Sequence, residues 1–256
     1  MEVQTGLSYE DALLIPQRSS VDSRSDIDLT TRLTPSIELD VPIISAAMDT
    51  VTEAETSIAL ANIGGLGVIH RFLSVSEQTA EVRKAAEEGG LVAAAIGIDE
   101  DYLDRTEAIL EAGGDAIVMD IAHGHMERAL DAVAEVRAEY DPELIAGNVV
   151  TPQAVRDLYG AGADCVKVGV GPGSHCTTRE VAGAGYPQLS AIDECADQAD
   201  KLGITVMADG GIQHSGDAAK ALMAGAGTVM MGGFFAGTDE APGSVVTRNG
   251  EQFKRS

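Results

Sequence analysis

Residues 91–124 have the sequence LVAAAIGIDEDYLDRTEAILEAGGDAIVMDIAHG. The pattern predicts a strand at Val92–Gly97, a helix at Tyr102–Ala112 and a second strand at Ala116–Ile121. Short, continuous apolar runs are typical of strands that are buried on both faces, as in a parallel sheet. A Gly-Gly pair after the helix provides a stop signal and a tight turn into the next strand. We interpret this stretch as one strand–helix–strand unit with parallel strands.

The same unit recurs along the whole chain. Further strands are predicted at Val41–Ala46, Leu66–Ile69, Leu144–Val149, Cys165–Val170, Thr205–Gly210 and Thr228–Gly233. Further helices are predicted at Thr52–Asn62, Ser74–Glu88, Met126–Tyr140, Thr151–Gly160, Gln188–Leu202 and Ser215–Ala224. Two of these helices begin with a capping pattern, Thr52 with Glu55 and Ser74 with Glu77. Eight strands alternating with helices predict an α/β fold, a closed (β/α)8 TIM barrel, with a doubly wound open sheet as the alternative.

The length of 256 residues is usual for one such barrel, and we expect a single domain over residues 1–256. Residues 1–40 precede the first predicted strand and are expected to form an N-terminal arm over one end of the barrel. No eighth helix can be recognised after the last predicted strand. Gly243–Ser256 has instead the pattern of a short hairpin around the turn dipeptide Asn249-Gly250. We therefore expect a barrel with a truncated C-terminal end.

The chain is strongly acidic, with 41 acidic and 17 basic residues and a net charge of −24. Such an acidic surface repels nucleic-acid backbones and anionic lipid, so neither is an expected partner. No apolar run reaches the roughly 18–20 residues that cross a bilayer, and the N-terminus lacks the features of a signal peptide. The three cysteines form no C-x-x-C pair, which argues against a disulfide framework or a zinc site. We expect a soluble protein of the cytoplasm.

The active site of a (β/α)8 barrel lies at the C-terminal ends of its strands, and the sharpest signal follows the sixth predicted strand. Residues 167–179 have the sequence KVGVGPGSHCTTR. The backbone of such a glycine-rich loop can hold an anion by its N–H groups or a cation by its carbonyls. The thiol of Cys176 is a candidate nucleophile, because a nearby cation such as Arg179 lowers a thiol pKa. The alternative is a small buried cysteine in a tight turn, the packing role that we expect for Cys165 and Cys195.

Two further strand ends carry glycine pairs. The seventh predicted strand ends in Asp209-Gly210-Gly211 and the eighth in Gly232-Gly233. Glycine pairs at these two strand ends are typical of the phosphate cradle of this fold. Asp209 is placed to accept hydrogen bonds from ribose hydroxyls, or alternatively to act as a helix cap or a turn residue.

Polar residues at the fourth and fifth strand ends should face the same opening. Asp120 lies near the end of the fourth predicted strand, and Asn148 lies near the end of the fifth. His123 and His125 follow, but no third ligand accompanies them, so a metal site on side chains is not expected. No G-x-G-x-x-G motif connects a first strand to a helix, which argues against a Rossmann fold. The pattern favours a phosphorylated ligand, either a nucleotide or another phosphorylated metabolite.

Four segments together resemble one known family, that of IMP dehydrogenase and GMP reductase. They are the loop Gly171–Arg179, Ala47-Met48-Asp49-Thr50-Val51, Gly147-Asn148-Val149 and Asp209-Gly210-Gly211. The loop is the most specific of them, and the resemblance extends over nearly the whole chain. It implies a purine nucleotide oxidoreductase that uses a nicotinamide cofactor.

The resemblance also implies roles for individual residues. Cys176 would attack C2 of the purine to form a thioimidate, and Thr178 would assist proton transfer. The phosphate and ribose of the nucleotide would be held by Ser174, Asp209, Gly210, Gly211, Gly232 and Gly233. Backbone carbonyls of Gly171, Gly173 and Cys176 would bind a monovalent cation, usually potassium. The cofactor, NADP(H) or alternatively NAD, would contact Ser23, Arg24, Arg71, Asp120, Ile121, Ala122, Asn148, Val170 and Gly171.

The motifs divide between the two branches of the family. Ser23–Asp26 and Gly185–Ala191 resemble the reductase branch, whereas Val51–Ala54 and Gly237–Glu240 resemble the dehydrogenase branch. No regulatory insertion of the dehydrogenase kind interrupts the predicted barrel. We therefore favour GMP reductase, which converts GMP to IMP and ammonia with NADPH.

Two alternatives follow from the same resemblance. One is IMP dehydrogenase, which converts IMP to XMP with NAD. The other is a nucleotide-binding barrel without turnover, because the base-recognising segment and flap of the family would begin where this chain stops. Members of the family are usually tetramers, so the resemblance also implies a homo-oligomer.

Overall fold

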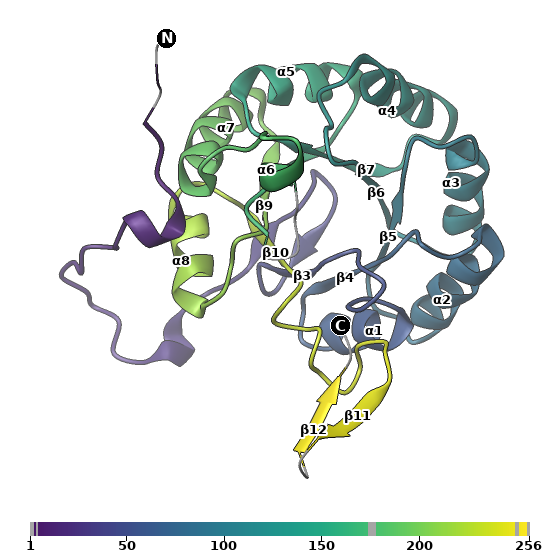
Figure 1. The fold of residues 1–256 in the computed structure, drawn as a ribbon, viewed down its shortest axis with the longest axis horizontal. Coiled ribbons are helices and arrows are strands. Elements are labelled where there is room, and N and C mark those ends of the chain that lie inside the picture. Colours follow the sequence, from purple (N-terminus) through teal and green to yellow (C-terminus); the bar gives the residue numbers. More distant parts are fainter. Residues whose placement is uncertain (1–2, 4, 174–177, 249–250, 255–256) are drawn as a thin grey trace.

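The computed structural model describes residues 3, 5–173, 178–248 and 251–254. Eight parallel strands close into a barrel in the spatial order β10-β3-β4-β5-β6-β7-β8-β9. Their bounds are β3 Ile43–Ser45, β4 Leu66–Ile69, β5 Val92–Ile96, β6 Ala116–Asp120, β7 Glu143–Val149, β8 Cys165–Val168, β9 Thr205–Asp209 and β10 Thr228–Met231. Helices surround the strands as an outer ring (Figure 1). The predicted (β/α)8 barrel is therefore confirmed, and the open sheet is excluded.

Every predicted helix is present, with ends within two residues of the expected ones. Their bounds are α1 Ala54–Ala61, α2 Val75–Glu87, α3 Tyr102–Glu111, α4 Glu127–Tyr140, α5 Pro152–Ala161, α7 Gln188–Leu202 and α8 Ser215–Met223. A short additional helix, α6 (Thr178–Val181), was not predicted. As expected, residues 232–244 contain no helix after β10.

One of the two predicted helix caps is confirmed and the other is wrong. At α2, the Ser74 hydroxyl accepts a hydrogen bond from the Glu77 amide at 3.3 Å, and the Glu77 carboxylate accepts one from the Ser74 amide at 3.0 Å. At α1, the residue before the helix is Glu53, and Thr52 does not cap it. The Thr52 hydroxyl instead donates to the Ala46 carbonyl at 2.7 Å, because Thr52 is fully buried beside β3.

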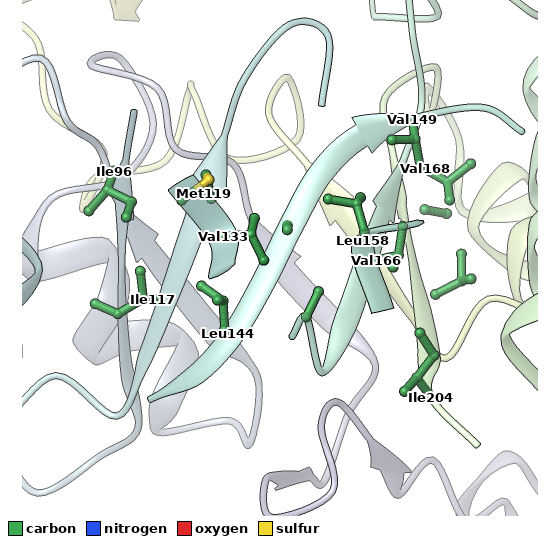
Figure 2. Close-up of a cluster of buried hydrophobic side chains, with 14 of the residues drawn as sticks. Ile96, Ile117, Met119, Val133, Leu144, Val149, Leu158, Val166, Val168 and Ile204 are labelled. Carbon is green, nitrogen blue, oxygen red and sulfur yellow. The ribbon is translucent and has the colours of Figure 1, made fainter. Parts of the chain in front are cut away.

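The core has two parts that follow the alternation of side chains along each strand. Along β5, Val92, Ala94 and Ile96 pack in a cluster with residues of the surrounding helices. Ala93 and Ala95 belong to a second cluster made by the inner faces of the strands. Figure 2 shows the outer cluster, in which Val133 of α4 and Leu158 of α5 lie among side chains of β6, β7 and β8.

Residues 31–39 add to the inner cluster. They form a hairpin of β1 (Thr31–Arg32) and β2 (Glu38–Leu39), and Leu33, Ile37 and Leu39 are buried. The preceding segment, with the short helices η1 (Tyr9–Asp11) and η2 (Arg24–Asp26), runs along the outside of the barrel next to α8 (Figure 1). The last part of the predicted arm therefore packs as part of the barrel, whereas much of the earlier part is exposed.

The described C-terminal residues form the predicted hairpin. β11 (Val245–Arg248) pairs with β12 (Glu251–Lys254) in antiparallel orientation, and the hairpin projects from the barrel (Figure 1). The predicted turn residues Asn249 and Gly250 lie outside the described residues. Among the described residues, no helix is both long and apolar enough to cross a bilayer.

Candidate active site

A cavity of about 770 Å³ opens at the C-terminal ends of the barrel strands. Its lining comes from β6, β7, β9 and β10 and from the loops that follow β3, β8, β9 and β10. This volume is in the usual range for sites of small ligands, about 300–1,000 Å³. The cavity lies where a (β/α)8 barrel carries its active site.

The glycines predicted to hold a phosphate all line this cavity. Gly210 and Gly211 follow β9 with φ angles of 91° and 80°, a backbone conformation that L side chains rarely adopt. A Cβ at Gly210 would lie 3.0 Å from the Pro172 side chain, so the loops after β8 and β9 approach closely here. Gly232 and Gly233, after β10, line the same cavity.

A still closer approach occurs at Gly169, directly after β8. Its φ angle is 151°, and a Cβ at this position would lie 2.0 Å from the Asp209 carbonyl oxygen. Only a residue without a side chain allows the ends of β8 and β9 to approach this closely. Gly169 therefore helps to determine where Asp209 lies relative to the loop after β8.

Four adjacent strands contribute one polar side chain each to a network in the wall of the cavity. Lys167 of β8 places its Nζ 2.7 Å from Asp120 Oδ1 of β6 and 2.6 Å from Asp209 Oδ2 of β9. Asn148 of β7 donates from Nδ2 to the same Asp209 oxygen at 2.8 Å and to the Gly169 carbonyl at 2.7 Å. Burial by itself would lower the pKa of Lys167, but the two carboxylates raise it above its usual value. Lys167 is therefore a cation at neutral pH.

Lys167 was not among the site residues predicted from the sequence. A signal was nevertheless present, because a single charged residue interrupts the apolar run Cys165–Val170. In a barrel whose strands are buried on both faces, a lysine at such a position needs an anionic partner. Which partners it has could not be inferred from the strand itself.

Asn148 also leaves one polar atom unsatisfied. Its Oδ1 is buried and has no hydrogen-bond partner within the described part of the chain. Buried side-chain oxygens are rarely left without a donor. Since Asn148 lines the cavity, a ligand that donates a hydrogen bond would satisfy this atom.

The predicted site residues divide into three groups. Those that line the cavity are Asp120, Asn148, Gly171, Gly173, Asp209, Gly210, Gly211, Gly232 and Gly233. Those outside its lining are Ser23, Arg24, Arg71, Ile121, Ala122, Val170 and Thr178. Ser174 and Cys176 lie outside the described residues. Thr178 is the first residue of α6.

Three of the predicted cofactor contacts have other neighbours in this structure. Ser23 precedes η2 on the exposed arm, and Arg24 is the first residue of that helix. The Arg71 guanidinium lies 3.2 Å from Asp99 and 5.4 Å from the ring centre of Phe72. The Ser23 and Arg71 side chains thus have partners on the arm and on the surface of the barrel, since the Ser23 hydroxyl accepts a hydrogen bond from the Ser25 amide.

Arg179 and the histidines can also be placed. A Cβ at Gly171 would lie 2.6 Å from the Arg179 side chain, so this cation packs on the loop that carries Cys176. His125 forms a 2.7 Å contact with Asp157. The described residues contain no group of three or more His, Cys, Asp or Glu side chains that could hold a metal ion.

Comparison with known proteins identifies the family of the chain. Residues 6–256 match the family model described as IMP dehydrogenase / GMP reductase domain. An inosine-5'-monophosphate dehydrogenase of Nitrosopumilus maritimus is 34% identical over 379 residues, covering 99% of this chain and 80% of the relative. Proteins of the same name from Borreliella burgdorferi and Cryptosporidium parvum are 38% and 40% identical, covering 97% and 93% of this chain and 74% and 70% of the relatives.

The first of these alignments spans 379 positions, more than the 256 residues of this chain, so that relative contains segments without a counterpart here. The match nevertheless includes both the barrel and the cavity-lining strand ends. The chain belongs to the IMP dehydrogenase / GMP reductase family and is an oxidoreductase of that family.

Proposed function

We propose that the chain oxidises IMP to XMP with NAD, by covalent catalysis at Cys176. The cavity with its two glycine pairs and Asp209 carries the assignment of a purine nucleotide as substrate. The relatives named inosine-5'-monophosphate dehydrogenase favour the dehydrogenase branch. They support the alternative of the sequence analysis better than its first choice, GMP reductase.

The nucleotide would lie across the ends of β9 and β10. Gly210, Gly211, Gly232 and Gly233 leave room for a phosphate to approach the backbone, since none of them carries a side chain. The Asp209 carboxylate would accept hydrogen bonds from the ribose hydroxyls. Ser174, which the family resemblance places on the phosphate, belongs to the same proposal.

The chemistry would take place at C2 of the purine. The Cys176 thiolate adds to C2, and the hydrogen of C2 leaves with its electron pair as hydride, so that a thioimidate remains. Water then adds to C2 and the thiolate leaves, which forms XMP and restores the enzyme. Thr178 would take part in the proton transfers. Arg179 packs against Gly171 and would favour the thiolate form of Cys176.

A nicotinamide dinucleotide would accept the hydride when bound. The residues present fit such a ligand, because Asp120, Asn148 and Gly171 line the cavity and none of the described residues donates a hydrogen bond to Asn148 Oδ1. Ile121, Ala122 and Val170 would flank this position. Carbonyls of Gly171, Gly173 and Cys176 would bind a potassium ion, which would stabilise the conformation of this loop.

Paired assays on the purified chain test the proposal. IMP with NAD should form NADH, whereas GMP with NADPH should leave NADPH unchanged. Cys176→Ala should lower turnover by at least about a thousandfold, because the covalent step is lost, while IMP binding persists. Cys195→Ala is the matched control, since Cys195 is buried in α7, and it should keep its turnover. Wild-type rates in Cys176→Ala would contradict covalent catalysis.

GMP reduction remains the second candidate, favoured by the arm segment Ser23–Asp26 and by the segment around Tyr186. Loss of NADPH with GMP, with release of ammonia and no NADH from IMP, would transfer the assignment to that branch. Binding of IMP without turnover in either assay would support a nucleotide-binding barrel. The homotetramer implied by the family stays a prediction, which light scattering can test.

A further inference from the structure

We propose that Lys167 is a positioning residue that anchors the nucleotide side and the dinucleotide side of the site at once. Its ammonium group lies 2.6 Å from Asp209 and 2.7 Å from Asp120, the two carboxylates that line the cavity. The proposed function assigns Asp209 to the ribose of the nucleotide and Asp120 to the nicotinamide dinucleotide. The inference therefore rests on that function and adds a residue to it.

Burial separates the lysine from the cavity, whereas the two carboxylates are exposed to it. The Lys167 side chain is 2% exposed, whereas those of Asp120 and Asp209 are 31% and 20% exposed. The ammonium thus lies behind the cavity wall, and the carboxylates lie at its surface. Lys167 would act through the two aspartates and would not touch either ligand itself.

The geometry explains why a cation is needed at this position. Both carboxylates lie within 2.7 Å of the same nitrogen atom, so they are close to each other. Without the cation, their repulsion would turn them apart or raise the pKa of one of them until it binds a proton. Where both carboxylates stay charged, Asp209 would no longer present a fixed acceptor to the ribose, whereas a proton on Asp120 would relieve the repulsion and leave Asp209 charged.

Other groups around the network do not replace the lysine. Asn148 donates one hydrogen bond to Asp209 but carries no charge. Among the described residues, Tyr9 of η1 is a further titratable group whose pKa is affected by Asp209. Burial and the charges of Asp217 and Asp209 raise its pKa, so it stays neutral. Among the described groups that interact with these carboxylates, Lys167 is the cation.

The first test is equilibrium binding of IMP to the full chain by calorimetry between pH 6 and pH 8. Lys167→Met should weaken IMP binding by about 10- to 100-fold at pH 8, by analogy with the loss of a side chain that supports a metal ligand. Binding should partly recover at pH 6, because protonation of one carboxylate relieves the repulsion. The wild-type chain should show no such recovery. In turnover assays, the KM for IMP and the KM for NAD should both rise.

Arg105→Met is the matched control. Arg105 is a buried cation of α3 that pairs with Asp101 at 2.7 Å, outside the cavity lining. Its loss should lower stability and leave the affinity for IMP and its pH profile unchanged. Equal weakening in Arg105→Met, or unchanged IMP affinity in Lys167→Met at pH 8, would overturn the positioning role.

A double variant covers the case in which Lys167→Met does not fold. Lys167→Met with Asp120→Asn removes one positive and one negative charge, so the net charge of the network stays the same. It should bind IMP about tenfold more weakly than the wild type, because Asp209 has lost its anchor, and without the recovery at pH 6. Wild-type affinity in this variant would refute the inference. Failure of the wild-type chain to bind IMP or GMP would instead refute the proposed function, and the role of Lys167 with it.

Discussion

A methyl group at position 169 has no room in the folded barrel. Its Cβ would lie 2.0 Å from the Asp209 carbonyl oxygen and 3.0 Å from the Gln188 side-chain nitrogen. The carbonyl belongs to the backbone at the end of β9, so relief requires the two strand ends to move apart. The φ angle of 151° adds strain, because residues with a Cβ rarely adopt this conformation.

The magnitude follows from these two effects. Forcing an extra carbon into a packed region costs about 1–3 kcal/mol, and a Cβ at positive φ costs about 1–2 kcal/mol. Gly169→Ala should therefore lower the free energy of unfolding by about 2–5 kcal/mol. The Gly169 carbonyl also accepts a hydrogen bond from Asn148, which in turn bonds to Asp209. The same displacement should thus weaken IMP binding.

Gly203→Ala separates the two effects. Gly203 ends α7 with a φ angle of 75°, and a Cβ there would meet no atom within 4 Å. This variant should lose only the conformational part, about 1–2 kcal/mol, and should bind IMP like the wild type. Urea unfolding followed by circular dichroism gives the free energies, and calorimetry gives the affinity. Equal losses of stability in the two variants would refute the steric reasoning at Gly169.

Two further predictions concern titratable groups. Burial alone would raise the pKa of Asp217, but hydrogen bonds from the His214 and Gln213 amides and from Lys220 lower it below its usual value. The carboxylate therefore stabilises the fold at neutral pH, and this contribution is lost as the pH falls below about 4. Asp217→Asn should lower the free energy of unfolding by about 1 kcal/mol at pH 7 and by progressively less towards pH 3. If urea unfolding gave the same difference between variant and wild type at every pH, this prediction would be wrong. Burial raises the pKa of Cys165 and Cys195 to about 12, so iodoacetamide at pH 8 should leave both unmodified in the native chain. Mass spectrometry should find a single label, absent from Cys176→Ala, and two or three labels on the native protein would contradict the burial.

The strands and helices could be predicted because each has a strong local pattern. Strand β4 is a continuous apolar run, and helix α7 has a periodic apolar face. Both were predicted with their observed bounds. The cap predicted at Thr52 does not form, and the sequence could not show this, because the Ala46 carbonyl to which the Thr52 hydroxyl donates comes within reach only once α1 packs beside β3. A capping pattern indicates which hydrogen bonds a side chain can form, whereas the tertiary structure decides which partners lie within reach.

The candidate site also contains residues that the sequence located and others that it did not. The strand-end glycines and Asp209 were found from sequence, since a closed parallel barrel brings all its C-terminal strand ends to one opening. Ser23, Arg24 and Arg71 were assigned by resemblance alone, and the structure places them outside the cavity lining. The choice between the reductase and dehydrogenase branches depended on motifs that point both ways. The names of the relatives shift it towards the dehydrogenase.

The sequence by itself determined the barrel and the opening at which its chemistry must lie, because strand periodicity and glycine turns act between residues that are neighbours in the chain. Only the tertiary structure decided that Lys167 neutralises Asp120 and Asp209 together. The three residues lie on separate strands, and a charge pair depends on distance in space, which the order of the sequence does not contain. The requirement for a glycine at position 169 also depends on the tertiary structure, because a side chain is excluded there only by the close approach of β9 to β8.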